Sequence, residues 1–141
     1  LDLAATLAGL MLLGRRPVFC ASTTLVAIPI SRQRMRERGF NQAWQLASLL
    51  ALELGQPFHH RLIRRVSHRP AQSSLRTAAA RKDNVSGQFS IHEAAPEDVV
   101  IVDDVLTSGS TTEEAARTLR SAGTQRVQIW CCARATLVAQ S

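Results

Sequence analysis

The hydrophobic residues of the chain fall into short runs, and polar or turn-forming residues separate these runs. Residues 3–13 are almost entirely apolar and are followed by Gly14 and then by Pro17, which predicts a helix that ends there. Residues 25–30 are apolar and interrupted by Pro29, which is typical of a buried strand that ends in a loop. We expect that loop to be basic, because it carries the four arginines Arg32, Arg34, Arg36 and Arg38.

A second set of runs continues this alternation. Asn41 can cap a helix that extends to about Glu53 and buries an apolar face that includes Trp44. Four consecutive β-branched residues over positions 99–102 predict the clearest strand. The other expected elements are strands over residues 62–66, 89–91 and 127–133 and a helix over residues 111–122. Because strands and helices alternate, we predict an α/β fold with an open, mostly parallel sheet, flanking helices, and ligands at the carboxyl ends of the strands.

The length and composition suit one domain, because the chain has 141 residues of which 45% are hydrophobic. We expect a single domain over residues 1–141, in which residues 1–20 form an N-terminal helix and its connection. No run of about 18 consecutive apolar residues occurs, so we expect a cytoplasmic protein without a membrane partner. Residues 67–88 show no clear period, and we predict a long flexible loop that acts as a lid over a site.

The net charge of +6 is unevenly distributed along the chain. Residues 1–82 carry thirteen Lys or Arg against three acids, whereas residues 83–141 carry four against eight. All of the basic residues except Lys82 are arginines, whose planar guanidinium suits phosphate and carboxylate groups. We therefore expect an anionic partner, and a polyphosphate ligand, nucleic acid or solvent alone stay open as alternatives.

The spacing of cysteines and histidines indicates neither a metal site nor a disulfide framework. Cys131 and Cys132 are neighbours, Cys20 is distant, and no C-x-x-C pair occurs, so we expect reduced, buried thiols. The histidines show no ligand spacing either, and we expect surface or loop positions for His59, His60, His68 and His92.

Two adjacent carboxylates follow the clearest strand. That strand delivers Asp103 and Asp104 to the edge of the sheet where α/β folds place their chemistry. Adjacent carboxylates are costly to hold together unless a cation or hydrogen-bond donors meet them, and a sugar diol with Mg²⁺ nearby meets that need. Residues 107–111 then offer hydroxyls, a permissive glycine and the free amides of a helix start, which suit a phosphate dianion. The structural alternative is a capping box formed by Ser110 and Glu113.

Other sites that use glycine-rich loops or acidic pairs fit this segment less well. The pattern G-x-x-x-x-G-K-[ST] requires a lysine, and G-x-G-x-x-G requires glycines, that the loop does not have. A receiver-type acidic pair would normally lie near the start of the domain with a partner lysine on a late strand. The only lysine is Lys82, so this interpretation fails as well.

The strand, the acidic pair and the loop together resemble the signature of type I phosphoribosyltransferases. Ser108 stands where a threonine is more usual, which is a mild departure. The resemblance implies that Asp103 and Asp104 bind the ribose hydroxyls of phosphoribosyl pyrophosphate and hold Mg²⁺, directly or through those hydroxyls or water. It also implies that the 5-phosphate lies in a loop formed by Val105, Thr107, Ser108, Gly109, Ser110 and Thr111.

A second set of segments is similar to the ComF/GntX branch of that family. It comprises residues 28–42, residues 72–75 and residues 81–89. The run Arg38-Gly39-Phe40-Asn41-Gln42 is the more discriminating part, since the phosphate loop is shared across the whole superfamily. Members of the branch usually begin with a cysteine-rich zinc-binding segment, which this chain does not contain. Either the chain is truncated or this member lacks the segment, and an initial Leu rather than Met favours truncation.

If the protein is an enzyme, the resemblance implies that a nitrogenous base displaces pyrophosphate at the anomeric carbon through an oxocarbenium-like transition state. The pyrophosphate would lie against the loop after the first strand, at Ile30, Ser31 and Arg32, with charge added by Arg34 or Arg38.

A second function and the question of turnover also stay open. As the alternative, the resemblance to ComF-like proteins implies a non-catalytic phosphoribosyl- or nucleic-acid-binding protein in DNA uptake or utilisation, with single-stranded DNA or proteins of the competence machinery as partners. The basic first half is compatible with this function, whereas an aromatic content of 4% argues against a stacking platform for single strands. A homodimer also stays open.

Overall fold

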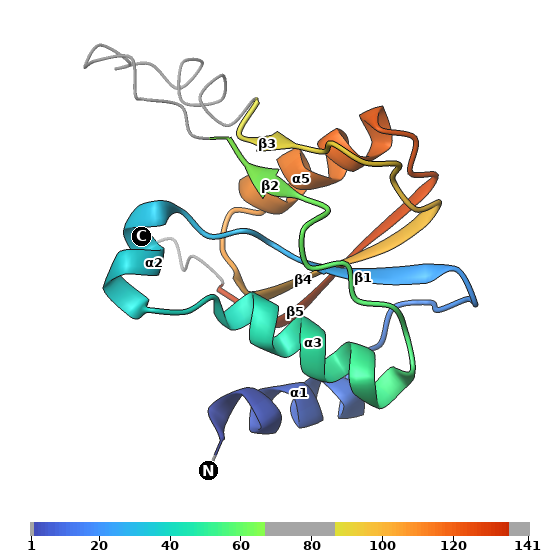
Figure 1. Cartoon of the computed structure of the whole chain (residues 1–141). Coiled ribbons are helices and arrows are strands. Elements are labelled where there is room, and N and C mark those ends of the chain that lie inside the picture. The colour runs from blue at the N-terminus through green and yellow to red at the C-terminus, as the bar shows by residue number, and fades with distance from the viewer. Residues whose placement is uncertain (1, 67–86, 136–141) are drawn as a thin grey trace, which may run out of the picture.

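A three-stranded parallel sheet in the order β1-β4-β5 forms the centre of the molecule (Figure 1). The computed structural model describes residues 2–66 and 87–135. The elements along the chain are α1 (Leu3–Leu13), β1 (Thr23–Ala27), α2 (Arg32–Arg38), α3 (Gln42–Leu54), β2 (Arg64–Arg65), β3 (Phe89–Ser90), β4 (Asp98–Leu106), α5 (Ser110–Ser121) and β5 (Arg126–Arg134). This arrangement confirms the predicted α/β fold with a parallel sheet and flanking helices.

The central strand β4 runs parallel to both of its neighbours. Val100 lies opposite Leu25 of β1 and opposite Gln128 of β5. Residues 99–102 are completely buried, because a central strand has protein on both faces. A short segment beside β1 extends the sheet: the Leu25 amide donates to Pro57 O (2.8 Å), and the His59 amide donates to Leu25 O (3.0 Å).

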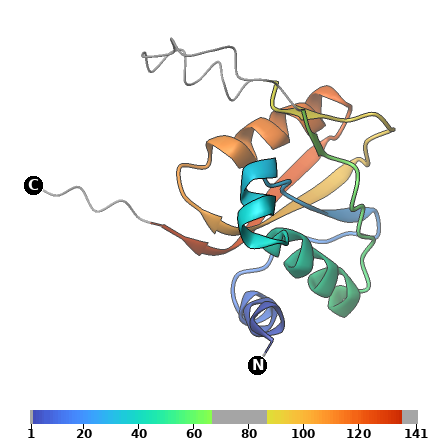
Figure 2. The same ribbon diagram turned by 60° about the vertical axis from the view of Figure 1, so that its left-hand side comes forward.

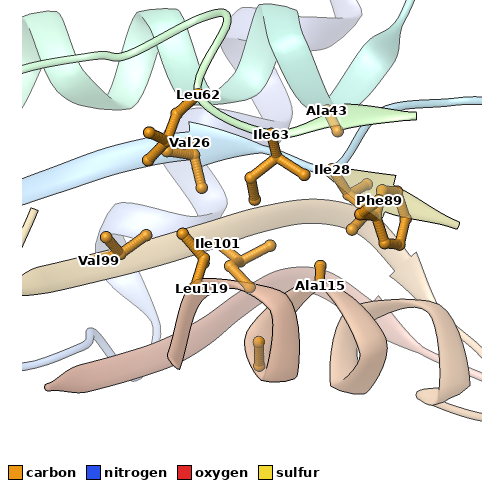
Figure 3. Packing of buried hydrophobic residues seen from close by; sticks show 11 residues of the cluster. Val26, Ile28, Ala43, Leu62, Ile63, Phe89, Val99, Ile101, Ala115 and Leu119 are labelled. Atoms are coloured by element: carbon orange, nitrogen blue, oxygen red, sulfur yellow. The ribbon is translucent and has the colours of Figure 1, made fainter. Parts of the chain in front are cut away.

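Helices lie on both faces of the sheet (Figure 2), and a hydrophobic cluster fills the space on each face. On one face, Val99 and Ile101 of β4 pack with Ala115 and Leu119 of α5 and with Phe89 of β3 (Figure 3). On the other face, the side chains of Val100 and Val102 pack among residues of α1, α3 and β5. Within residues 2–66 and 87–135, no helix is long and apolar enough to cross a membrane.

The basic segment after β1 is a helix, so the prediction of a loop there was wrong. Ser31 caps α2, with its Oγ accepting a hydrogen bond from the Arg34 amide (3.2 Å), and Gly39 ends the helix with φ at 77°. Arginine, glutamine, methionine and glutamate all favour helices. No residue of α2 is buried, so the segment has no apolar periodicity by which the sequence could indicate a helix.

The strand predicted over residues 62–66 is also different from the one observed. Only Arg64 and Arg65 are in a strand, and β2 pairs antiparallel with β3 in a separate two-stranded sheet. The apolar residues that suggested a strand, Leu62 and Ile63, are buried in the core without strand pairing. The predicted loop over 67–88 lies outside the described residues except for its last two positions.

Two predictions of burial were wrong. The Trp44 side chain, predicted to be in the core, is 44% exposed, whereas Trp130 is buried at 4%. The three cysteines are free, but Cys20 is exposed and the other two are only partly buried. Trp44 lies in the first turn of α3, where its backbone amide donates to Oδ1 of the capping residue Asn41 at 3.4 Å.

Candidate functional site

The carboxyl ends of β1 and β4 border a cavity of about 310 Å³. The turn after β1, the helices α2 and α3, the end of β4 and the start of α5 all contribute to its walls. The cavity is lined by residues 28–31, 41–43, 103–109, 111 and 112, and by Arg34, Arg38, Arg65 and Gln88. The cavity therefore lies at the carboxyl ends of the strands, where the sequence predicted that ligands bind.

The acidic pair, Asp103 and Asp104, lies in this cavity, in the last part of β4. The pKa of Asp103 is raised to about 7, mainly by burial and additionally by hydrogen bonding to and repulsion from the neighbouring carboxylate of Asp104. Asp104 is closer to a cation, because its Oδ2 lies 3.7 Å from Nη1 of Arg38. The remaining contacts of the pair are local, since each Oδ1 accepts a hydrogen bond from the next backbone amide at 2.9 Å. The pair therefore favours a ligand that brings positive charge or hydroxyl donors.

β4 continues past the acidic pair to Leu106, beyond the predicted end of the strand at residue 102, and a tight loop then turns the chain into α5. Gly109 makes this turn possible, because its φ of 78° lies in the left-handed region that side chains disfavour. Among the described residues, the amides of Thr111 and Thr112 have no acceptor, as expected for the first turn of a helix. Free amides at a helix start and the hydroxyls around them make a site for a phosphate group.

Ser110 does not have the role expected from the capping-box pattern. It is the first residue of α5, Gly109 occupies the cap position, and no side chain caps the helix. The Ser110 hydroxyl instead lies 2.9 Å from that of Ser108. Of the predicted phosphate-loop residues, Ser110 is the one that does not line the cavity, whereas Val105, Thr107, Ser108, Gly109 and Thr111 all do.

The turn after β1 and the helix α2 form the opposite wall. Of the residues predicted for the pyrophosphate side, Ile30, Ser31, Arg34 and Arg38 line the cavity, whereas Arg32 does not. The geometry of α2 explains why Arg34 and Arg38 line the cavity together, because residues four apart share one face of a helix. Arg32 is not on that face.

Several lining residues were not among the predicted site residues. Asn41 and Gln42 belong to the Arg-Gly-Phe-Asn-Gln run, which was a usable signal, and the side-chain Nδ2 of Asn41 donates to Ile28 O at 3.0 Å. Thr112 follows directly on the predicted phosphate loop and donates its hydroxyl to Gly109 O at 3.0 Å. Arg65 and Gln88 lie far apart in sequence, and no local pattern marks either as a site residue.

The acidic pair is a reasonable donor set for Mg²⁺. Hard carboxylate oxygens are the donors that Mg²⁺ prefers, and it completes its shell with water and ligand phosphates. Among the residues that the structure describes, no cluster of three or more metal-ligating side chains occurs. The residues therefore fit a Mg²⁺ ion shared with a bound ligand rather than one caged by protein alone.

Comparison with known proteins identifies the family. A model of the phosphoribosyl transferase domain matches residues 41–136. Competence protein F of Haemophilus influenzae is 35% identical over 115 residues, which cover 79% of this chain and 50% of that protein. The DNA utilization protein YhgH of Salmonella typhi is 38% identical over 111 residues, which cover 78% of this chain and 48% of that protein. The chain thus spans about half the length of these curated relatives.

Solved structures support the same fold. An allosteric regulatory enzyme of purine biosynthesis matches with a TM-score of 0.56 at 21% identity, over 92% of this chain and 25% of that one. The orotate phosphoribosyltransferase of Aeropyrum pernix matches with a TM-score of 0.52 at 17% identity, over 92% of this chain and 70% of that one. The chain therefore belongs to the phosphoribosyl transferase domain family, and its curated relatives place it in the ComF branch.

Proposed function

We propose that this protein binds phosphoribosyl pyrophosphate with Mg²⁺ and transfers the phosphoribosyl group to a nitrogenous base. The observation that carries the proposal is the shared cavity: the Asp103-Asp104 pair and the phosphate-binding loop over 107–111 lie together at the carboxyl end of β4. In the cavity, the acidic pair is accompanied by the hydroxyl-rich loop and by the arginines of α2. A ligand that carries a diol between a phosphate and a second anionic group has matching chemical groups.

Each wall of the cavity has a role in this mechanism. The free amides of Thr111 and Thr112 hold the 5-phosphate, and the acidic pair accepts hydrogen bonds from the ribose hydroxyls. Positive charge that develops on the sugar ring in the transition state is stabilised by the same carboxylates. Arg34 and Arg38 lie on the wall where the leaving pyrophosphate gathers negative charge. Asp103 and Asp104 would hold Mg²⁺, which would supply positive charge to neutralise part of the charge on the leaving group.

A thermal shift experiment tests the binding. Phosphoribosyl pyrophosphate with Mg²⁺, at about a hundredfold excess over its Kd, should raise the melting temperature by about 8 °C. The double variant Asp103→Asn, Asp104→Asn should lose this shift, because it removes the groups that meet the diol and the metal. The control is Glu53→Gln with Glu97→Gln, which removes two exposed acids elsewhere and should leave the shift unchanged. No shift in the unmutated protein would contradict the proposal.

Release of pyrophosphate separates a transferase from a binding protein. The unmutated protein is incubated with phosphoribosyl pyrophosphate, Mg²⁺ and a panel of purine and pyrimidine bases, and pyrophosphate is measured with a coupled assay. Base-dependent release supports transfer. Tight binding without release for any base restricts the function to binding.

A second candidate function, nucleic-acid binding, has its own structural support. The exposed helix α2 carries four arginines, and the two aromatic side chains that follow it, Phe40 and Trp44, are 43% and 44% exposed. Exposed aromatics next to arginines suit stacked bases and a phosphate backbone. The relatives named for competence and DNA utilisation favour the same interpretation.

Fluorescence anisotropy with a labelled single-stranded oligonucleotide tests this second function. Binding should weaken steeply with salt, and Trp44→Ala should weaken it further through lost stacking, about 1–3 kcal/mol per base. Leu52→Ala, which truncates an exposed side chain of the same helix, is the control and should have no effect. Equal effects of the two variants would argue against a stacking surface.

A further inference from the structure

Helix α1 has two apolar stripes, and only one of them is covered by the part of the chain that the structure describes. Ala4, Ala8 and Met11 are buried on the side of the helix that packs against α3 and β5 (Figure 1). The other stripe, called the outer stripe below, consists of the exposed residues Leu3, Thr6, Leu10 and Leu13.

The outer stripe is unusually apolar for the surface of a helix. The side chains of Leu3, Leu10 and Leu13 are 62%, 57% and 85% exposed. Residues 3–13 include no charged residue, whereas a helix at a protein surface normally has a charged or polar face. The hydroxyl of Thr6 donates to Asp2 O at 3.1 Å, which leaves its methyl group for apolar contact. The outer stripe is therefore suited to a second apolar surface.

The spacing of the outer stripe matches that of a helix pair. Its positions alternate between steps of three and four residues, as do the residues in the seam between two packed helices. The pattern is also symmetric, because Leu3 and Leu13 are equally distant along the chain from Ala8. The inner pair, Thr6 and Leu10, has the same midpoint. In two antiparallel copies of α1 related by a twofold axis, Leu3 therefore meets Leu13 of the other copy, and Thr6 meets Leu10.

The charges that flank α1 suit the same arrangement. Asp2 precedes the helix, Arg15 and Arg16 follow it, and all three residues are exposed. In an antiparallel pair, Asp2 of each copy lies beside the arginines of the other copy, whereas a parallel pair would bring like charges together. The dipoles of the two helices are also opposed in the antiparallel pair. The flanking charges thus favour a second copy of this chain as the partner.

We propose that the outer stripe of α1 is a dimer interface, which binds the same stripe of a second copy in antiparallel orientation. A pair of 11-residue helices is smaller than a standard protein interface of roughly 1,200–2,000 Å², so the dimer should be weak, with a Kd on the order of 10–100 µM. No residue of α1 lines the cavity, so the interface does not depend on the ligand that the cavity binds.

Sedimentation equilibrium at protein concentrations from about 5 to 500 µM, which bracket that Kd, tests the interface. Leu10→Glu should weaken dimerisation by at least about 10-fold, because it places a charge in the apolar seam of both copies. The control is Leu52→Glu, which makes the same change at a leucine of α3 that is 76% exposed, and it should leave the Kd unchanged. A monomer over the whole range would overturn the proposal, and so would a dimer that both variants weaken equally or that neither weakens.

Disulfide crosslinking tests the antiparallel orientation. All variants carry Cys20→Ser, because Cys20 is an exposed free cysteine. A mixture of Leu3→Cys and Leu13→Cys should form a crosslinked dimer on mild oxidation, since facing positions of a helix pair bring their Cβ atoms within reach of a disulfide. Either variant alone should crosslink far less, because its cysteine then meets a leucine. Equal crosslinking by one variant alone would indicate a parallel pair and overturn the proposed arrangement.

A lipid surface is the other partner that an apolar helix face can bind, and co-sedimentation with phosphatidylcholine vesicles distinguishes the two. The unmutated protein should stay in the supernatant, as should Leu10→Glu. A monomeric protein that sediments with the vesicles, and that no longer does so as Leu10→Glu, would assign the outer stripe to lipid and overturn the dimer.

Discussion

The two ends of β4 carry carboxylates in opposite situations. At the amino end, Asp98 is 4% exposed and accepts hydrogen bonds from Arg126, Thr23 and Cys20, with the Arg126 Nε at 2.9 Å. The bonds from Arg126 hold the pKa of Asp98 well below the usual carboxyl range. Near the carboxyl end, burial raises the pKa of Asp103 to about 7, and no cationic side chain bonds to it among the described residues.

This difference separates a carboxylate that stabilises the fold from one that is suited to a ligand. Buried charges in a stable protein are normally paired, as Asp98 is, and the pairing joins the start of β1 to the starts of β4 and β5. An unpaired carboxylate in a cavity costs stability, and such costs concentrate at functional sites. One strand therefore carries both a buried acid that is paired with an arginine and a second acid to which no cation bonds among the described residues.

Removal of the charge at Asp98 should have the largest effect on stability. Asp98→Asn breaks a buried ion pair and should lower the free energy of unfolding by about 3 kcal/mol at pH 7. Because the pKa of Asp98 is depressed in the folded state, this contribution is full above about pH 4 and is lost as the pH falls further. Urea unfolding at pH 7 measures the change.

Glu97→Gln is the control for this substitution, because it makes the same chemical change at the exposed neighbouring position. It should change the free energy of unfolding by less than about 0.5 kcal/mol. If Asp98→Asn were equally mild, the amino end of β4 would not be the anchor that its contacts indicate. Binding of phosphoribosyl pyrophosphate by folded Asp98→Asn should be unaffected.

Asp103→Asn should act in the opposite direction. A carboxyl group whose pKa is raised on folding destabilises the folded state once the pH exceeds its unfolded pKa, and the full cost is reached above the folded pKa. The shift to about 7 corresponds to about 4 kcal/mol, which solvent screening of this partly exposed group reduces to about 2 kcal/mol. At pH 8 the variant should therefore be more stable than the unmutated protein by about that amount, while its ligand binding is lost.

The pH dependence distinguishes this explanation from a general packing effect. The gain from Asp103→Asn should shrink between pH 7 and pH 4, because the unmutated protein becomes protonated at Asp103 over that range. Urea midpoints at pH 4, 6 and 8 provide the measurement. A gain that is the same at all three values would mean that repulsion and burial of the charge are not its cause.

The sequence was sufficient for the parts of the molecule that depend on local patterns. The β-branched run of β4, the apolar face of α3 with its Asn41 cap, and the acidic pair followed by a hydroxyl-rich loop all have short-range signals. These signals predicted the parallel sheet and placed the two aspartates at one edge of the cavity. Periodicity is reliable where one face of an element is buried and the other is not.

The parts that failed depend on contacts between distant residues. Helix α2 buries no residue, so its arginines indicated a loop. Arg65 reaches the cavity only because β2 pairs with β3, a contact across 23 positions between Arg65 and Gln88. The difference between Asp98 and Asp103 was equally hidden, since Cys20 and Arg126 approach Asp98 from 78 and 28 positions away. Composition and spacing do not encode which acid receives a cation.

The smallest expected effect tests the loop that follows the unsatisfied end of β4. Gly109→Ala should cost about 1 kcal/mol, because φ at 78° disfavours a side chain even though the added Cβ would meet nothing closer than 3.9 Å. Gly9→Ala makes the same change within α1, where nothing lies within 4 Å, and should instead stabilise the protein by about 1 kcal/mol. Opposite signs in urea unfolding would show that the loop holds a strained turn. Binding of ribose 5-phosphate should weaken in Gly109→Ala alone, since only that variant disturbs the amides at the start of α5. Equal affinity of the two variants for ribose 5-phosphate would mean that the turn at Gly109 does not contribute to phosphate binding.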